Sequence, residues 1–259
     1  MKTLIRLELR RTNFRTYVIS ALIIAVIMLG FLYLFAYAPM LETNDADMKI
    51  FSGYENLIPL YGVLNMTVFC VLAAVIYSKI IIEEYSGKRP ILLFSYPINR
   101  KKIMLSKLCI VFVFTVIAMF ISNFVFKFIT KSVKKNCIAK SKRTFLFLIF
   151  IIFGVSEKFL HLVSGDFTYS IMFQAIETTL IMSLSAASIG IIAVGIGFIK
   201  KSVPTTIVSA VLIASLMCNI VANTTSSKIA MYIFVAVMIL IGIMFSAILM
   251  KKVEVMEVE

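Results

Sequence analysis

The sequence contains no tryptophan, one histidine and few charged residues, and these shortages exclude whole classes of protein. Charged residues make up 15% of the chain and apolar residues 61%, whereas soluble domains average roughly 25% and 45–50%. No soluble fold can bury that much apolar surface. The four cysteines lack paired or metal-type spacing, so we expect neither a disulfide framework nor a metal site.

Nucleotide-binding and catalytic motifs are missing as well. The pair Gly87-Lys88 lacks the earlier glycine of a phosphate-cradling loop, and Arg89 stands where Ser or Thr is required. An intramembrane enzyme is a rival class, but the lone His161 lies nearly half a turn from Ser156 around a helix. We therefore predict no catalytic residue, and no cofactor held by this chain.

The apolar residues are gathered into uncharged runs long enough to span a bilayer. A hydrocarbon core of about 30 Å requires about 20 helical residues, because backbone amides inside it must be paired within the segment. Six runs meet this condition: residues 17–38, 57–78, 108–126, 178–199, 203–222 and 229–250. The sequence predicts an all-α polytopic bundle of about six transmembrane helices, in one domain over residues 1–259.

The distribution of charge predicts the orientation of these helices. Five basic residues and the single acid Glu8 precede the first run. The charged residues of segment 41–56 are mostly acidic, whereas those of segment 79–107 are mostly basic. Basic loops stay in the cytoplasm, so we expect both termini inside and residues 41–56 outside. The formal net charge of +13 then indicates contact with anionic lipid headgroups rather than with nucleic acid.

Residues 127–177 do not follow this pattern. The segment should lie outside, yet its first part is rich in lysine and contains no acid. In one arrangement, residues 108–126 form the third crossing and an apolar piece after the lysines is re-entrant or interfacial. In the other, residues 144–163 cross instead. This places Glu157 and Lys158 at membrane depth, where inserting each charged side chain costs about 2.5–3.5 kcal/mol. Both arrangements stay open.

Polar residues inside or beside the apolar runs have two interpretations. They can line a translocation path, or they can form hydrogen bonds between helices, each of which stabilises the bundle by about 0.6–2 kcal/mol. The candidate path residues are Asn65, Asn123, Glu177 and Asn219. Small residues four apart, Ala186 with Gly190 and Ala193 with Gly197, indicate close packing within the bundle or in a dimer.

The cytoplasmic loop between the second and third runs contains more than basic residues. An apolar patch at residues 91–94 lies between Pro90 and Pro97, which favour the start and the end of a short helix along the membrane surface. Such a helix either anchors the loop in lipid or offers a partner protein an apolar knob.

This loop resembles that of ABC transporter permeases of the type-2 exporter class. The matching residues are Glu83, Glu84, Gly87, Leu92, Leu93, Pro97, Arg100 and Lys107, with Phe94 completing the patch. The resemblance implies that residues 83–107 form the coupling helix that docks on a separate ATPase, which would bind ATP and Mg. It also implies that residues 1–15 are an interfacial segment. Lys88 stands where Thr is common, and residues 127–152 look like an insertion.

We therefore expect the permease subunit of an ABC exporter in a bacterial plasma membrane. The resemblance implies a homodimer, or a heterodimer with a similar permease, together with ATPase subunits. Antimicrobial peptides, drugs and lipid-linked molecules are the cargo classes that it suggests. An ATP-independent carrier is the alternative, and an intramembrane enzyme is the third hypothesis.

Overall fold

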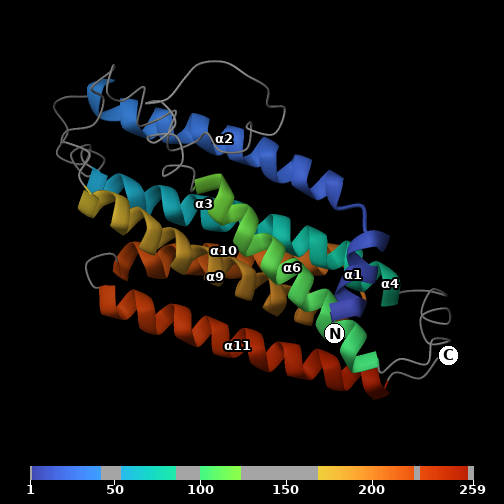
Figure 1. Ribbon diagram of the computed structural model, residues 1–259. Coiled ribbons are helices and arrows are strands. Elements are labelled where there is room, and N and C mark those ends of the chain that lie inside the picture. The colour runs from blue at the N-terminus through green and yellow to red at the C-terminus, as the bar shows by residue number, and fades with distance from the viewer. Residues whose placement is uncertain (1, 42–53, 86–99, 124–168, 225–227, 256–259) are drawn as a thin grey trace, which may run out of the picture. The chain divides into compact units, whose positions relative to one another are not determined.

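The computed structural model describes residues 2–41, 54–85, 100–123, 169–224 and 228–255 (Figure 1). Within these ranges every regular element is a helix and there is no strand. The helices are α1 (Lys2–Arg11), α2 (Phe14–Leu41), α3 (Tyr54–Tyr77), the π-helical turn η2 (Ser78–Ile82), α4 (Glu83–Tyr85), α6 (Arg100–Asn123), α9 (Tyr169–Ile199), α10 (Val203–Thr224) and α11 (Lys228–Val255). The predicted all-α fold is confirmed.

Among the described residues, six helices are long and apolar enough to cross a membrane. Each corresponds to one of the six predicted runs. The run 57–78 ends at the first residue of η2, directly after α3, and α6 covers its run as far as Asn123. The helices are longer than the runs because polar residues continue them beyond the apolar part. The chain is thus a multi-pass membrane protein. Helix α6 is continuous from Arg100 to Asn123, whereas the alternative crossing at residues 144–163 lies outside the described residues.

The chain divides into two compact units. Unit 1 comprises Met1–Tyr17, Met66–Val116 and Ser183–Glu259, and unit 2 comprises Val18–Asn65 and Ile117–Met182. Several long helices contribute one part to each unit.

Close helix packing in unit 1 depends on the small residues of α9. A Cβ atom placed on Gly190 would lie 3.0 Å from both the Ala73 Cβ and the Tyr77 Cε2 atoms of α3. A Cβ on Gly197 would overlap the hydroxyl of Thr206 on α10. The stripe of small residues predicted from the sequence therefore serves contacts within this chain.

In unit 2, α3 contacts both α6 and α9. The Asn65 side-chain amide donates to the Ser122 hydroxyl over 3.4 Å, and both residues are buried. A Cβ on Gly62 would lie 3.0 Å from the Thr178 methyl carbon. Large apolar side chains on α2, among them Ile23 and Leu34, are exposed, as expected for a helix that faces lipid.

Candidate functional site

Helix α1 turns a face of both apolar and acidic side chains toward the rest of unit 1. Leu4 and Ile5 are half-buried and Glu8, one turn later, is buried, whereas Arg6 and Leu7 are exposed. The spacing of three and four residues puts the partly buried side chains on one face of the helix. An acidic side chain therefore occupies the middle of the face that packs against the protein.

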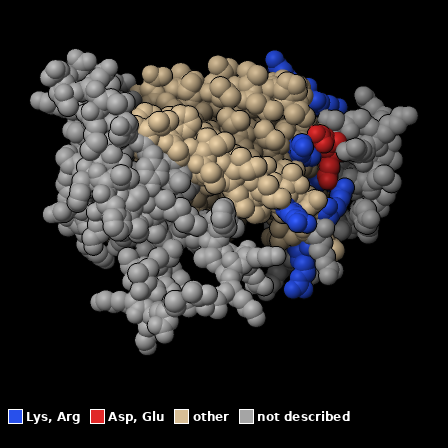
Figure 2. Space-filling view, turned by 90° about the horizontal axis from the view of Figure 1, so that it is seen from above, with Lys and Arg blue, Asp and Glu red and all other residues tan. Residues whose placement is uncertain are grey.

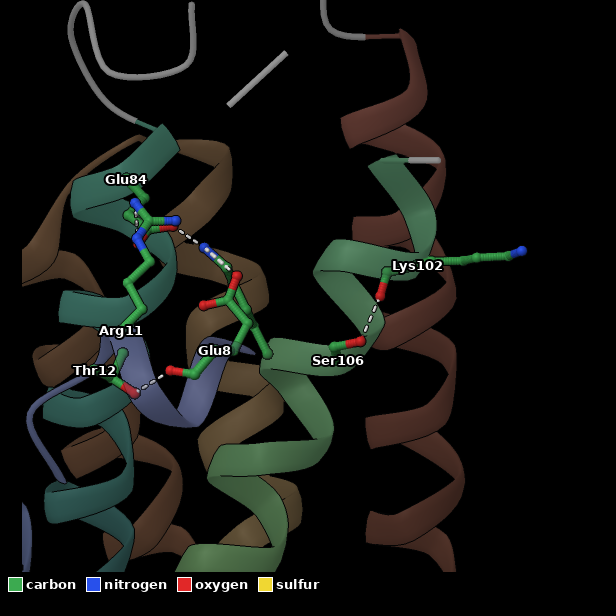
Figure 3. A network of polar contacts seen from close by, with 7 residues as sticks. Glu8, Arg11, Thr12, Glu84, Lys102 and Ser106 are labelled. Carbon is green, nitrogen blue, oxygen red and sulfur yellow. Dashed lines mark hydrogen bonds and ion pairs between the residues drawn. The ribbon is translucent and has the colours of Figure 1, made fainter. Parts of the chain in front are cut away.

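A short turn separates α1 from α2. The Thr12 hydroxyl donates to the Glu8 carbonyl oxygen over 2.7 Å, and the Thr12 backbone N–H donates to the same oxygen over 3.0 Å (Figure 3). The Phe14 N–H then donates to the Thr12 carbonyl as α2 begins. These bonds fix α1 as a separate helix before the first membrane helix.

The end of α3 changes from α-helical to π-helical geometry at Ser78 and returns to α-helical geometry at Glu83. The Glu83 N–H donates to the Ser78 carbonyl, which closes the wider turn. Single π-helical turns are uncommon and often occur at functional sites. The turn is followed at once by Glu83, which is exposed, and by Glu84, which faces partly inward.

The first two turns of α6 place a lysine in an apolar stripe. Ile103, Met104, Lys107, Leu108 and Val111 are all buried, at the spacing of one helix face, and the Lys107 side chain is 0% exposed. A buried ammonium is costly unless carboxylates compensate its charge. Those carboxylates come from α1 and α4.

The site is an ionic cluster of Glu8, Arg11, Glu84 and Lys107. Lys107 forms an ion pair with Glu84, and its Nζ lies 4.0 Å from Oε1 of Glu8. The Arg11 guanidinium lies 3.1 Å from the other Glu84 oxygen. With two cations and two carboxylates, the formal net charge of the cluster is zero. Figure 3 shows Glu8 and Arg11 of α1 facing Glu84.

The cluster is shielded to different degrees along its length. The side chains of Glu8 and Glu84 are 10% and 16% exposed, whereas Arg11 is 56% exposed. The Lys107 Nζ also lies 5.6 Å from the centre of the Tyr85 ring, a favourable position for a cation–π contact. The cluster is therefore open to water on the Arg11 side and closed around Lys107.

Aromatic contacts connect the cluster to the core of unit 1. The Tyr85 ring packs edge-on against Phe198 of α9 with 5.6 Å between ring centres. About two turns before Tyr85, the Tyr77 hydroxyl donates to the Leu108 carbonyl over 3.2 Å. The end of α3 is thus held to both α9 and α6, next to the ion pairs.

A second ion pair holds the other side of α6. The Lys101 Nζ lies 2.7 Å from a carboxylate oxygen of Glu254, near the end of α11. Both side chains are substantially exposed, at 40% and 54%. The start of α6 is therefore tied to helices from both ends of the chain, by buried charges toward α1 and by an exposed pair toward α11.

Basic side chains gather around this site. In Figure 2, Lys and Arg cluster at one end of the described surface, next to acidic residues. The described basic residues of unit 1 include Arg6, Arg15, Lys79, Arg100, Lys102, Lys200, Lys201, Lys251 and Lys252. This grouping agrees with the charge asymmetry from which the orientation was predicted.

The structure describes only part of the predicted coupling loop. Glu83 and Glu84 end its first flank, and Arg100 begins its second flank in a half-buried position. Residues 86–99, which include Gly87, Leu92, Leu93, Phe94 and Pro97, lie outside the described residues. Their role as the docking patch stays a prediction.

The predicted translocation residues occupy dissimilar environments. Asn65 is buried in unit 2 beside Ser122, and Glu177 is half-buried on α9. Asn219 is exposed on α10, where its amide donates to the Ser215 carbonyl over 3.0 Å. Asn123 is the last residue of α6, and its side chain lies outside the description. A common path through these residues stays a prediction.

Glu8 and Arg11 were not predicted as site residues. Glu8 was counted only as an acid opposing the basic N-terminus, and Arg11 only as part of that basic group. A signal was present, since Glu8 follows Leu4 and Ile5 at helical spacing and thus stands on the apolar face of a short helix. An acid in that position requires a buried partner.

Comparison with known proteins identifies the family of this chain. The sequence model of the ABC-2 family transporter proteins matches residues 4–163, more than half of the chain, and this range includes the whole ionic cluster and the loop. The uncharacterised protein YcbO of Bacillus subtilis (strain 168) is 30% identical over 216 residues, 83% of each chain. No solved structure matches. This chain is therefore a member of the ABC-2 family of membrane transporter proteins.

Proposed function

We propose that this chain is the membrane-spanning permease subunit of an ATP-driven exporter whose ATPase is a separate polypeptide. Family membership supports the transporter role, and the lack of a phosphate-binding loop in the sequence requires the ATP energy to come from a partner. ATP and Mg would bind to that partner, and this chain contributes no catalytic residue.

The observation that carries the proposal is the ionic cluster at the base of the loop. A loop transmits movement only when its two flanks are fixed to the helices that must move. Glu84 ends one flank and Lys107 lies two turns into the helix that forms the other, and they are paired where water is largely excluded. Tyr85 extends the connection to α9 through Phe198. Force applied to residues 86–99 would therefore reach α3, α6 and α9 together.

The basic end of unit 1 supports a cytoplasmic position for the loop. Lysine and arginine are retained on the cytoplasmic side of membrane proteins, where an ATPase has access to ATP. In this orientation both termini are cytoplasmic, and residues 41–56 lie outside a bacterial plasma membrane. The resemblance of the loop also implies that the permease pairs with a second copy or with a similar permease.

The decisive perturbation is Leu93→Asp in the predicted docking patch. Removing a buried leucine from a contact costs roughly 1.5–3 kcal/mol, and a carboxylate there adds an unpaired buried charge. We expect the variant to insert normally but to lose the associated ATPase. The measurement is co-purification of a polypeptide with a phosphate-binding loop, together with its ATP hydrolysis in native membrane vesicles.

Ile50→Asp provides a matched control, since it makes the same kind of change in the loop expected on the opposite side of the membrane. It should leave ATPase association unchanged. If the Leu93 variant retained its ATPase and its hydrolysis, the loop would not be the docking site. If the wild-type chain carried no ATPase, the ATP-independent carrier would become the better interpretation.

A further inference from the structure

The four charges of the ionic cluster alternate in sign along a line of contacts. Glu8 lies 4.0 Å from Lys107, Lys107 is paired with Glu84, and Glu84 lies 3.1 Å from Arg11. The two outer members belong to α1, and the two inner members belong to the two flanks of the loop. Helix α1 therefore faces both flanks at once.

An alternating row of this kind can be paired in two ways. In the observed arrangement Lys107 lies against Glu84, so α4 and α6 are joined directly. In the other arrangement Lys107 pairs with Glu8 while Glu84 keeps Arg11. No buried charge loses its partner in this exchange, so the cost of an uncompensated charge does not arise. The direct connection between α4 and α6 is then absent, and α1 holds each of them.

The shift needed for the exchange is small. A lysine-carboxylate hydrogen bond is about 2.8 Å long, so the Lys107 ammonium needs to move by only about 1 Å to bond Glu8. The flexible four-carbon stem of lysine allows such a movement without a change in the helix backbone. The pair with Glu84 is lost only when the flank that carries Glu84 moves away from α6.

The geometry points to Glu8 as a positioning residue, whose carboxylate takes over Lys107 when the two flanks of the loop separate. Helix α1 stays in contact with both flanks of the loop during the movement. The inference rests on the proposed function for the cause of that movement, which is the ATPase docked on residues 86–99. The exchange itself is a property of this chain alone.

A double-mutant cycle in the purified chain tests the exchange without any ATPase. Glu8→Gln and Glu84→Gln each leave Lys107 one carboxylate, and the double variant leaves it none among the two that contact it. Arg11 is 56% exposed and can be hydrated when Glu84 is changed. We expect each single variant to lower Tm by less than about 4 °C and the double variant by more than about 10 °C. The Arg6→Gln variant is the control on the exposed side of α1.

Adding Lys107→Met to the double variant removes the uncompensated charge and should restore most of the lost stability. This triple variant keeps the test conclusive if the double variant does not fold, because failure to recover would overturn the inference. The inference would also be overturned if the Tm loss of the double variant equalled the sum of the two single losses. A Glu84→Gln variant as unstable as the double variant would overturn it too.

Hydrogen exchange separates a positioning role from general stability. In Glu84→Gln the amides of residues 78–85 and 100–107 should exchange faster, because Lys107 has moved to Glu8 and no longer joins the flanks. Amides of α11 should keep their wild-type rates. An equal increase throughout the described helices would show that the cluster only stabilises the fold, and it would overturn the positioning role. Neither measurement depends on the Leu93 experiment, so the two proposals can fail separately.

Discussion

Replacing Lys107 by methionine should destabilise the protein far more than the same change at Lys101, although the two lysines stand less than two turns apart on α6. Methionine matches the length of the lysine stem and removes only the charge. Lys107 is 0% exposed and contacts carboxylates that are 10% and 16% exposed. Lys101 and its partner Glu254 are 40% and 54% exposed.

Burial sets the magnitude of each effect. Without Lys107, the cluster changes from neutral to a net charge of −1, since only Arg11 remains to balance Glu8 and Glu84. Breaking a buried pair in this way costs about 3–5 kcal/mol, whereas an exposed pair contributes about 0–1 kcal/mol. At about 2–4 °C for each kcal/mol, we expect Tm losses of about 6–20 °C for Lys107→Met and at most about 4 °C for Lys101→Met.

Thermal unfolding followed by circular dichroism is the suitable assay, because the chain has no tryptophan for fluorescence. Measurements in low and high salt add a second criterion. Salt screens exposed charges over a Debye length of about 10 Å at 0.1 M, so the small Lys101 effect should disappear at high salt while the Lys107 effect persists. Equal losses in the two variants, or a Lys107 effect abolished by salt, would refute the assignment of a buried cluster.

Two further predictions concern packing and topology. Gly190→Val should lower stability by about 1–3 kcal/mol, because its Cβ would already lie 3.0 Å from Ala73, whereas Gly30→Val, with nothing within 4 Å, should behave like wild type in the same unfolding assay. Cysteines introduced at Asp45 and Lys135 should both react with an impermeant thiol reagent in intact cells. Protection of position 135 until lysis would instead favour the crossing at residues 144–163.

The sequence by itself determined the fold class and the number of described membrane helices. A bilayer sets a minimum length for an apolar helix and excludes charge from it, so the runs could be read directly from composition. Each described membrane helix overlaps its predicted run over most or all of the run's length. The docking patch of the coupling loop stays a prediction.

Only the tertiary structure decided which residues form the site. Glu8 and Lys107 are far apart in the sequence. Glu8 appeared there only as an acid opposing the basic N-terminus, and Lys107 only as a residue by which the loop resembles that of known permeases. Their burial depends on α1 folding back against α4 and α6, which no local pattern specifies. The stripe of small residues around Gly190 was equally ambiguous. Small residues permit another helix to approach closely but do not determine which helix it is. The structure identifies α3 and α10 of the same chain as partners, because packing is a property of facing surfaces rather than of one helix.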